Sequence, residues 1–213
     1  MSSDEPTVFV VDDDEAVRVS LARLLRSAGW KVETFASAAA FLERPAFAGI
    51  GCVLLDVQMP GLTGPQLQQA MVERQFTLPV IFLTGHGDVP TGIQAMKRGA
   101  VDFLLKPLDD EELLAAIEQA VQRHAQTRAR RKACDEIGAR LKRLSARERE
   151  VMERVIRGSL NKQIAGDLGI AEKTVKVHRA RVMDKMEVRS VAELVHLWET
   201  AGLAQTSRGA EQG

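Results

Sequence analysis

The first half of the chain repeats one pattern five times: a short β-rich apolar run followed by a segment with helical spacing. The runs occupy residues 8–11, 31–35, 52–55, 80–83 and 101–105. The helical segments follow at residues 15–28, 38–43, 65–74 and 89–98, and a fifth helix is expected after Asp109. Strands that alternate with helices form parallel sheets, and mostly continuous apolar runs are typical of strands buried on both faces. The pattern therefore predicts an α/β domain built on a parallel five-stranded sheet.

The rest of the chain differs in pattern and in charge. Residues 1–124 carry a formal charge of −7 and residues 125–213 carry +7, so the net charge of zero is a cancellation. Beyond Ser145 the sequence shows helical patterns only, at residues 145–157, 161–168, 172–186 and 191–201. We expect two modules with different partners, of which the basic, all-helical one suits a polyanion.

The segment between the modules, residues 125–143, is charged, alanine-rich and favourable for a helix, with no sustained apolar stripe. We expect a helical linker that prolongs the preceding helix. A dimeric coiled coil is the less favoured alternative, because the heptad apolar positions lapse after Val121. The predicted domains are residues 1–124, the linker, a four-helix domain at 144–205 and a disordered tail at 206–213.

Composition also bounds the environment of the protein. The two cysteines, Cys52 and Cys134, allow neither a disulfide framework nor a cysteine-based zinc site. The first residues lack the basic and apolar regions of a signal peptide, and no apolar run approaches the roughly 20 residues that span a membrane. We expect a soluble cytoplasmic protein with no membrane partner.

Polar groups follow four of the five predicted strands, and only the second strand ends without one. In a sheet of order 2-1-3-4-5 the second strand lies at the edge, so the other four strand ends converge where such sheets bind ligands. The converging residues are Asp12, Asp13, Asp56, Thr84 and Lys106. Taken alone, Asp56 would be a turn former before Pro60, and Asp14 is expected to cap the following helix.

The three carboxylates at this edge repel one another and Lys106 offsets only part of their charge, so either their pKa values rise or a cation lies among them. Their oxygens suit Mg²⁺, beside which Asp56 is a competent nucleophile toward phosphorus. Thr84 can donate a hydrogen bond to a phosphoryl oxygen, and Lys106 can neutralise another. The set predicts phosphoryl transfer to Asp56.

The motifs VVDDD, LLDVQMPGLTG, FLTGHGD and GAVDFLLKP resemble the receiver domain of bacterial two-component response regulators, which has a flavodoxin-like fold. The stretch TGHGDVPTGIQAMKRGAVDFLLKP is particularly similar to the FixJ-like branch of these regulators. The resemblance covers about residues 6–124. It implies that Asp56 accepts phosphate from a sensor histidine kinase. It also implies Mg²⁺ held by Asp56, by Asp12 or more often Asp13, and by the backbone carbonyl of Gln58.

Two further roles follow from the same resemblance. Thr84 and Phe103 would form the coupled switch pair, although an aromatic residue in a parallel strand is usually core. The Lys106–Pro107 bond is expected to be cis, an isomer that costs only about 0.5–1 kcal/mol at X-Pro.

In the basic half, residues 161–186 break at Gly169 into two short helices, which is helix-turn-helix geometry. Val175, Val182 and Met186 give the second helix an inward face, and His178 is expected to be a structural hydrogen-bonder on that side. The outward residues suit base edges and phosphates of double-stranded DNA. They are Lys173, Thr174, Lys176, Val177, Arg179, Ala180 and Arg181.

The whole block from LSARE to VAELV resembles the LuxR-type helix-turn-helix domain, in which Ser145 and Glu148 fit a capping box. The two resemblances together imply a response regulator transcription factor rather than an enzyme, with only self-catalysed phosphoryl transfer and autodephosphorylation. Phosphorylation would favour a homodimer through the fourth helix and fifth strand, about residues 89–105, and RNA polymerase is a further candidate partner.

Two alternatives stay open at this stage. An aspartyl-phosphate phosphohydrolase would need a second aspartate two residues after the nucleophile, where this chain has Gln58, and a cap domain. A phosphorylation-independent DNA-binding regulator with a vestigial receiver would not need the acidic set, which is intact.

Overall fold

The computed structural model describes residues 5–45, 47–85 and 102–210, and of α9 beyond Thr200 only the backbone and Gly202. The chain divides into two compact units, residues 1–127 and residues 128–213. Among the helices of the described residues, none is both long and apolar enough to pass through a bilayer.

The first unit is built on a five-stranded sheet in the order β2-β1-β3-β4-β5. All four pairings between neighbouring strands are parallel. The predicted sheet and its order are therefore confirmed. The strands are β1 (Thr7–Val11), β2 (Lys31–Phe35), β3 (Gly51–Asp56), β4 (Val80–Thr84) and β5 (Asp102–Leu105).

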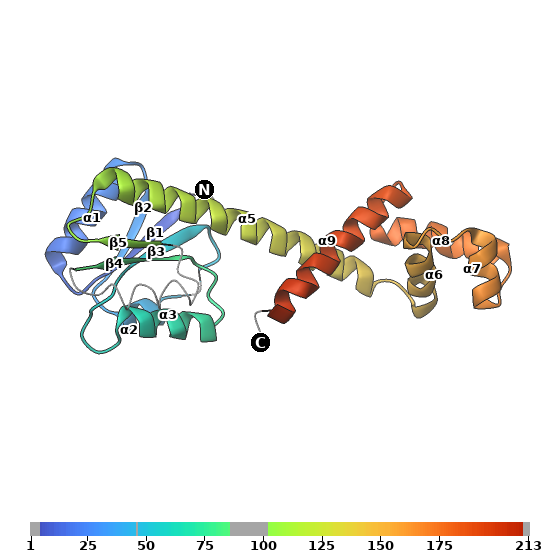
Figure 1. The fold of residues 1–213 in the computed structure, drawn as a ribbon, viewed down its shortest axis with the longest axis horizontal. Coiled ribbons are helices and arrows are strands. Elements are labelled where there is room, and N and C mark those ends of the chain that lie inside the picture. The colour runs from blue at the N-terminus through green and yellow to red at the C-terminus, as the bar shows by residue number, and fades with distance from the viewer. Residues whose placement is uncertain (1–4, 46, 86–101, 211–213) are drawn as a thin grey trace. The chain divides into compact units, whose positions relative to one another are not determined.

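Helices cover both faces of this sheet (Figure 1). On one face, α1 (Glu15–Ser27) and the first part of α5 (Asp110–Lys142) enclose a core that includes Leu25, Leu54 and Ile117. On the other face, α2 (Ala38–Glu43) and α3 (Gly64–Glu73) enclose a second core. The helix predicted at residues 89–98 lies outside the described residues.

The second unit packs α6 (Ala146–Ile156), α7 (Asn161–Leu168), α8 (Glu172–Met186) and α9 (Val191–Ala210) around one apolar core. The end of α5 contributes to this core as well. Ile137 is 4% exposed and Leu141 packs beside it, although both lie in the segment predicted as a linker without an apolar stripe. Two apolar residues one turn apart are enough to dock the end of a charged helix.

Candidate functional site

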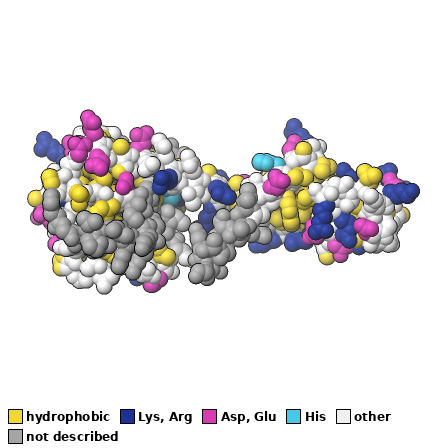
Figure 2. Space-filling model, viewed as in Figure 1, with side chains coloured by type: hydrophobic (Ala, Val, Ile, Leu, Met, Phe, Trp, Pro, Cys, Tyr) yellow, Lys and Arg dark blue, Asp and Glu magenta, His cyan; other side chains and the backbone are white. Residues whose placement is uncertain are grey.

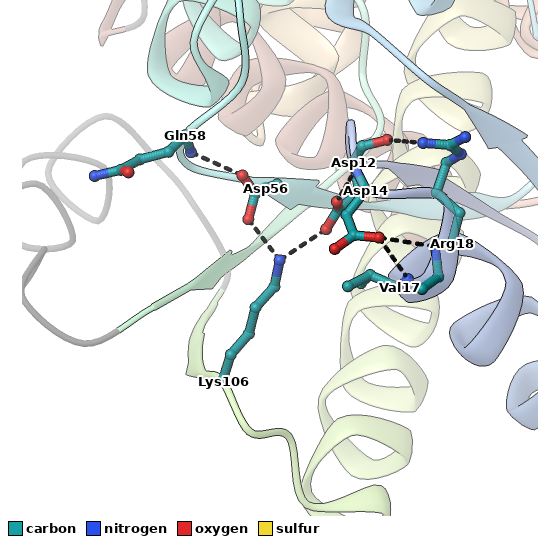
Figure 3. A network of polar contacts seen from close by, with 8 residues as sticks. Asp12, Asp14, Val17, Arg18, Asp56, Gln58 and Lys106 are labelled. Carbon is teal, nitrogen blue, oxygen red and sulfur yellow. Dashed lines mark hydrogen bonds and ion pairs between the residues drawn. The ribbon is translucent and has the colours of Figure 1, made fainter.

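The ends of three strands meet at one charged cluster in the first unit (Figure 3). The Lys106 ammonium lies 2.8 Å from Asp12 Oδ2 and 2.7 Å from Asp56 Oδ1. Asp12 is 1% exposed and Asp56 is 7% exposed, so the ammonium bridges two buried carboxylates. The Lys106–Pro107 peptide bond is cis, as predicted.

Local hydrogen bonds fix the acidic end of β1. Asp14 caps α1, because its Oδ1 accepts from the backbone nitrogens of Ala16 at 2.8 Å and Val17 at 3.4 Å. Asp12 Oδ1 accepts from the Asp14 nitrogen at 2.9 Å, and the Arg18 guanidinium donates to the Asp12 carbonyl at 2.8 Å. The predicted cap is confirmed, and Arg18 is a further support that the sequence did not single out.

A tight turn after β3 holds Asp56 in place. Its Oδ2 accepts from the Gln58 nitrogen at 2.9 Å, so Asp56 does form a turn as well as facing Lys106. The turn passes through Gly61 at φ +80° and closes where Gly64 N–H donates to the Val57 carbonyl at 3.0 Å. A Cβ on Gly64 would lie 2.3 Å from the Asp56 carbonyl oxygen, so this approach requires glycine.

The electrostatics of the cluster leave it short of positive charge. Burial raises the pKa of Asp56 above its ordinary value, against the opposing effect of the Lys106 hydrogen bond. Burial lowers the pKa of Lys106, but its hydrogen bonds to Asp12 and Asp56 outweigh burial and raise it overall. One ammonium thus faces two carboxylates, which leaves a net negative charge in a buried place.

This donor set fits a hard divalent cation. In proteins Mg²⁺ is commonly held by one or two carboxylates, with water molecules in the rest of its shell. Asp13, the third predicted acidic residue, is exposed. Within residues 5–45, 47–85 and 102–210, no group of three acidic, histidine or cysteine side chains has a metal-binding arrangement. The oxygens that the structure brings together are therefore those of Asp12 and Asp56.

The two residues predicted as a switch pair lie on adjacent strands. Thr84 ends β4, is 1% exposed, and its hydroxyl donates to the Gly85 carbonyl at 3.2 Å. Phe103 lies beside Phe82 in the register of β5 with β4 and is half-buried against the α2/α3 core. Leu104 packs in the core on the other face, so Phe103 and Leu104 face opposite layers of the sheet.

In the second unit, α7 and α8 form the predicted pair of short helices, separated at Gly169 with φ +64°. Val175, Val182 and Met186 are buried, as expected. Figure 2 shows Lys and Arg side chains gathered over this unit. The predicted outward residues are exposed except for the half-buried Arg179: Lys173, Thr174, Lys176, Val177, Ala180 and Arg181.

Two of these side chains already have protein contacts. Lys176 Nζ lies 3.4 Å from a carboxylate oxygen of Glu172, one turn earlier on α8. The Arg179 guanidinium donates to Asn161 Oδ1 at 2.9 Å and so ties α8 to the first residue of α7. Lys176 therefore remains on the exposed face of α8, whereas the half-buried Arg179 lies against α7.

The interior of the second unit also contains polar groups. Glu148 is 3% exposed and accepts from Lys185 Nζ at 2.6 Å. That bond, and a second from the Ser145 backbone nitrogen, lower the pKa of Glu148 to about 2. The predicted capping box is confirmed, whereas its partner Lys185 was missed. The prediction for His178 is not supported at Nδ1, which is buried and has no hydrogen-bond partner in the part of the chain that the structure describes.

The fold and the charged cluster define a class that the family comparisons confirm. Residues 8–118 match the response regulator receiver domain, and residues 142–198 match the bacterial regulatory proteins of the luxR family. The chain belongs to the response regulators that combine a receiver with a LuxR-type helix-turn-helix domain. It is a transcription regulator rather than a phosphohydrolase.

Relatives over almost the whole chain place it more narrowly. The transcriptional regulatory protein FixJ of Azorhizobium caulinodans is 47% identical over 197 residues, 92% of this chain and 93% of FixJ. The response regulator TodT of Pseudomonas putida is 43% identical over 199 residues, 93% of this chain and 88% of TodT. The chain is thus FixJ-like, as its motifs predicted.

Solved structures give the same result. The response regulator StyR is 50% identical with a TM-score of 0.85, covering 92% of this chain and 98% of StyR. Full-length FixJ from B. japonicum is 45% identical with a TM-score of 0.59, covering 94% of this chain and 98% of FixJ.

Proposed function

We propose that Asp56 accepts a phosphoryl group from a sensor histidine kinase and that this modification controls DNA binding by the second unit. The bridge from Asp12 through Lys106 to Asp56 carries the proposal, because it places an acceptor carboxylate beside a cation at the converging strand ends. An Asp56 carboxylate oxygen forms the new bond to phosphorus as the phosphorus–nitrogen bond to the kinase histidine breaks.

Each neighbour has a defined role in this proposal. The Lys106 ammonium neutralises one phosphoryl oxygen, and the Thr84 hydroxyl donates a hydrogen bond to another. Asp12, Asp13, Asp56 and the Gln58 carbonyl would hold Mg²⁺, which supplies charge stabilisation during the transfer. The burial of Asp12 and Asp56 supports this arrangement, because burial strengthens each of these charged contacts.

We propose that the switch acts through Thr84 and Phe103 and favours a homodimer. The dimer surface would include the fourth helix and β5, about residues 89–105, of which residues 102–105 are described. The exposed Leu105 supports an apolar contact there. Shifting a two-state equilibrium from 1:99 to 99:1 requires about 5.5 kcal/mol, which is large for one phosphoryl group. We therefore propose a graded switch, in which phosphorylation shifts the equilibrium between the two states only part of the way.

In the second unit, the exposed residues of α8 would read DNA in the major groove. Lys173, Thr174, Lys176, Val177 and Ala180 would meet base edges, and Arg179 and Arg181 would meet phosphates. A dimer would bind paired half-sites. We place this activity in the cytoplasm, with RNA polymerase as a further partner. The predicted limits of the receiver, linker, DNA-binding domain and tail are part of the same proposal.

The test is phosphate incorporation from a small-molecule phospho-donor in the presence of Mg²⁺, followed by intact-protein mass. Wild type should gain one phosphoryl group, and Asp56→Asn should gain none. Asp14→Asn is the matched control, since Asp14 lies near the cluster but only caps α1. Full incorporation by Asp56→Asn would refute the assignment of the acceptor.

A further inference from the structure

The residue that ends α8 has an unusual backbone conformation. Glu187 lies in the left-handed region at φ +57°, where glycine is favoured. The preceding helices of this unit do use glycine there, with Gly158 at φ +83° after α6 and Gly169 at φ +64° after α7. A glutamate in the third such position indicates that its side chain has a role which outweighs the backbone preference.

The Glu187 carboxylate holds Arg140 of α5 and Arg143, the residue that follows α5. Its Oε2 lies 3.1 Å from Arg140 Nη2, and its Oε1 lies 2.9 Å from Arg143 Nη1. Arg140 Nη1 also donates to the Met186 carbonyl at 3.2 Å, at the end of α8 where backbone carbonyls lack helical partners. We call these three side chains, Glu187, Arg140 and Arg143, the α5–α8 clamp.

The clamp lies beside an apolar contact between the same two helices. Ile137 and Leu141 of α5 belong to the same core as Val182 and Met186 of α8. Isolated surface ion pairs contribute little to stability. Here, however, apolar packing already holds the two helices together, so the ion pairs need only restrict the residual motion of the C-terminal end of α8. The last turns of α5 thus support α8 through both its buried face and its terminal residue.

We propose that the α5–α8 clamp positions the recognition helix, so that residues 137–143 are a working part of the DNA-reading unit. The family match to this unit begins only at residue 142, which leaves Ile137, Arg140 and Leu141 outside it. The inference rests on the proposed contact of α8 with DNA. Base readout tolerates displacements of only about 0.5 Å and 10–20°, so a helix held at its far end reads bases more selectively.

The test uses two substitutions of Glu187 in the full chain. The DNA probe is a duplex enriched from a random pool by the wild-type protein, compared with a scrambled duplex. Glu187→Gln removes a negative charge, which by simple electrostatics would strengthen binding to both duplexes. Positioning predicts instead that affinity for the enriched duplex falls several-fold while affinity for the scrambled duplex does not fall.

Glu187→Gly distinguishes an effect on positioning from an effect on stability. The substitution removes the carboxylate of the clamp, and it also places glycine at a left-handed position where glycine is favoured. We expect an unchanged or raised Tm together with the same several-fold loss of selectivity. Glu136→Gln, an exposed glutamate of α5, is the matched control for charge and should leave selectivity unchanged. If both Glu187 variants keep wild-type selectivity, the positioning proposal is overturned.

Hydrogen exchange of the free protein distinguishes this failure from failure of the proposed function. Glu187→Gln should speed amide exchange in the last turn of α8 with no DNA present, and unchanged exchange there would overturn the clamp. A wild-type protein that enriches no sequence would refute DNA reading itself.

Discussion

The Nδ1 atom of His124 accepts a hydrogen bond from the backbone N–H of Gly51 at 3.2 Å, although the two residues are 73 positions apart in the sequence. Since Nδ1 is the acceptor, Nε2 carries the proton and donates to Thr77 Oγ1 at 3.2 Å. The ring is 3% exposed. A Cβ on Gly51 would lie 2.1 Å from the Thr7 carbonyl oxygen, so β1 and β3 approach each other there too closely for any residue but glycine.

His124→Ala should destabilise the first unit by about 2–4 kcal/mol, because it leaves the Gly51 amide without its acceptor and opens a cavity. Denaturant unfolding followed by Trp30 fluorescence, in a Trp198→Phe background, measures this loss. Gln122→Ala, an exposed change on the same helix, is the control. Equal midpoints for the two variants would contradict a structural role for His124.

Lys106→Met should make the first unit depend on Mg²⁺ for stability. Without the ammonium, the carboxylates of Asp12 and Asp56 repel each other. We therefore expect the free energy of unfolding of the first unit to fall by about 1–3 kcal/mol in metal-free buffer. Thermal unfolding with and without MgCl₂ should then show a larger gain in Tm for the variant than for wild type. A smaller gain would mean that Lys106 does not compete with the cation.

Glu148→Gln should destabilise the second unit at neutral pH, while keeping the side-chain length of the capping box. A folded-state pKa of about 2, below the ordinary 4.5, means that the charge of Glu148 stabilises the fold above about pH 4.5. The stabilisation is lost as the pH falls from 4.5 toward 2. We expect the free energy of unfolding of Glu148→Gln to be about 1–3 kcal/mol below that of wild type at pH 7. This difference should shrink as the pH falls below about 4.5.

Urea unfolding at a series of pH values, followed by Trp198 fluorescence, tests this. Glu150→Gln is the matched control, because Glu150 forms an exposed pair with Arg147 on the same helix. If the free energies of unfolding of wild type and Glu148→Gln differed by the same amount at all pH values, the charge of Glu148 would not be the cause of the stabilisation.

Substitutions on α8 should separate base readout from phosphate contact. Lys176→Ala should reduce the free energy of binding to the enriched duplex by about 1–3 kcal/mol and lower the selectivity for that duplex. Arg181→Ala should weaken binding to all duplexes and reduce the dependence of log affinity on log salt concentration by about one unit of slope. Fluorescence anisotropy titrations across a range of salt concentrations would measure both effects. The reverse assignment would follow if Arg181→Ala alone changed selectivity.

The sequence predicted the strands and most of the charged cluster because both depend on local patterns, whereas the sheet order is not local and was predicted as the usual order of such an open α/β sheet. A strand that ends in a chemically active residue places that residue at one edge of the sheet, so the sequence alone groups Asp56, Thr84 and Lys106. Asp13 joins this group as part of the acidic run that ends the first strand and, by the resemblance, as a Mg²⁺ ligand. Its neighbours Asp12 and Asp14 are fixed by hydrogen bonds, whereas Asp13 itself is exposed.

What the sequence did not reveal are contacts between distant elements that follow no period. His124 lies within the long helix α5, and nothing in its spacing indicates that it accepts a hydrogen bond from Gly51. Ile137 and Leu141 form no stripe, and nothing in the sequence shows that Glu187 would meet Arg140. Such pairings depend on how helices cross, which residue spacing does not determine.

The close approach of Gly64 to the Asp56 carbonyl has an evolutionary consequence. Every residue other than glycine at position 64 adds a carbon 2.3 Å from that oxygen, so a single substitution there would displace the acceptor while leaving every charged group of the cluster intact. A lineage could thus abandon phosphate signalling and still retain its full set of acidic residues. For judging which descendants of such a protein remain switchable, this uncharged position is as informative as the aspartates.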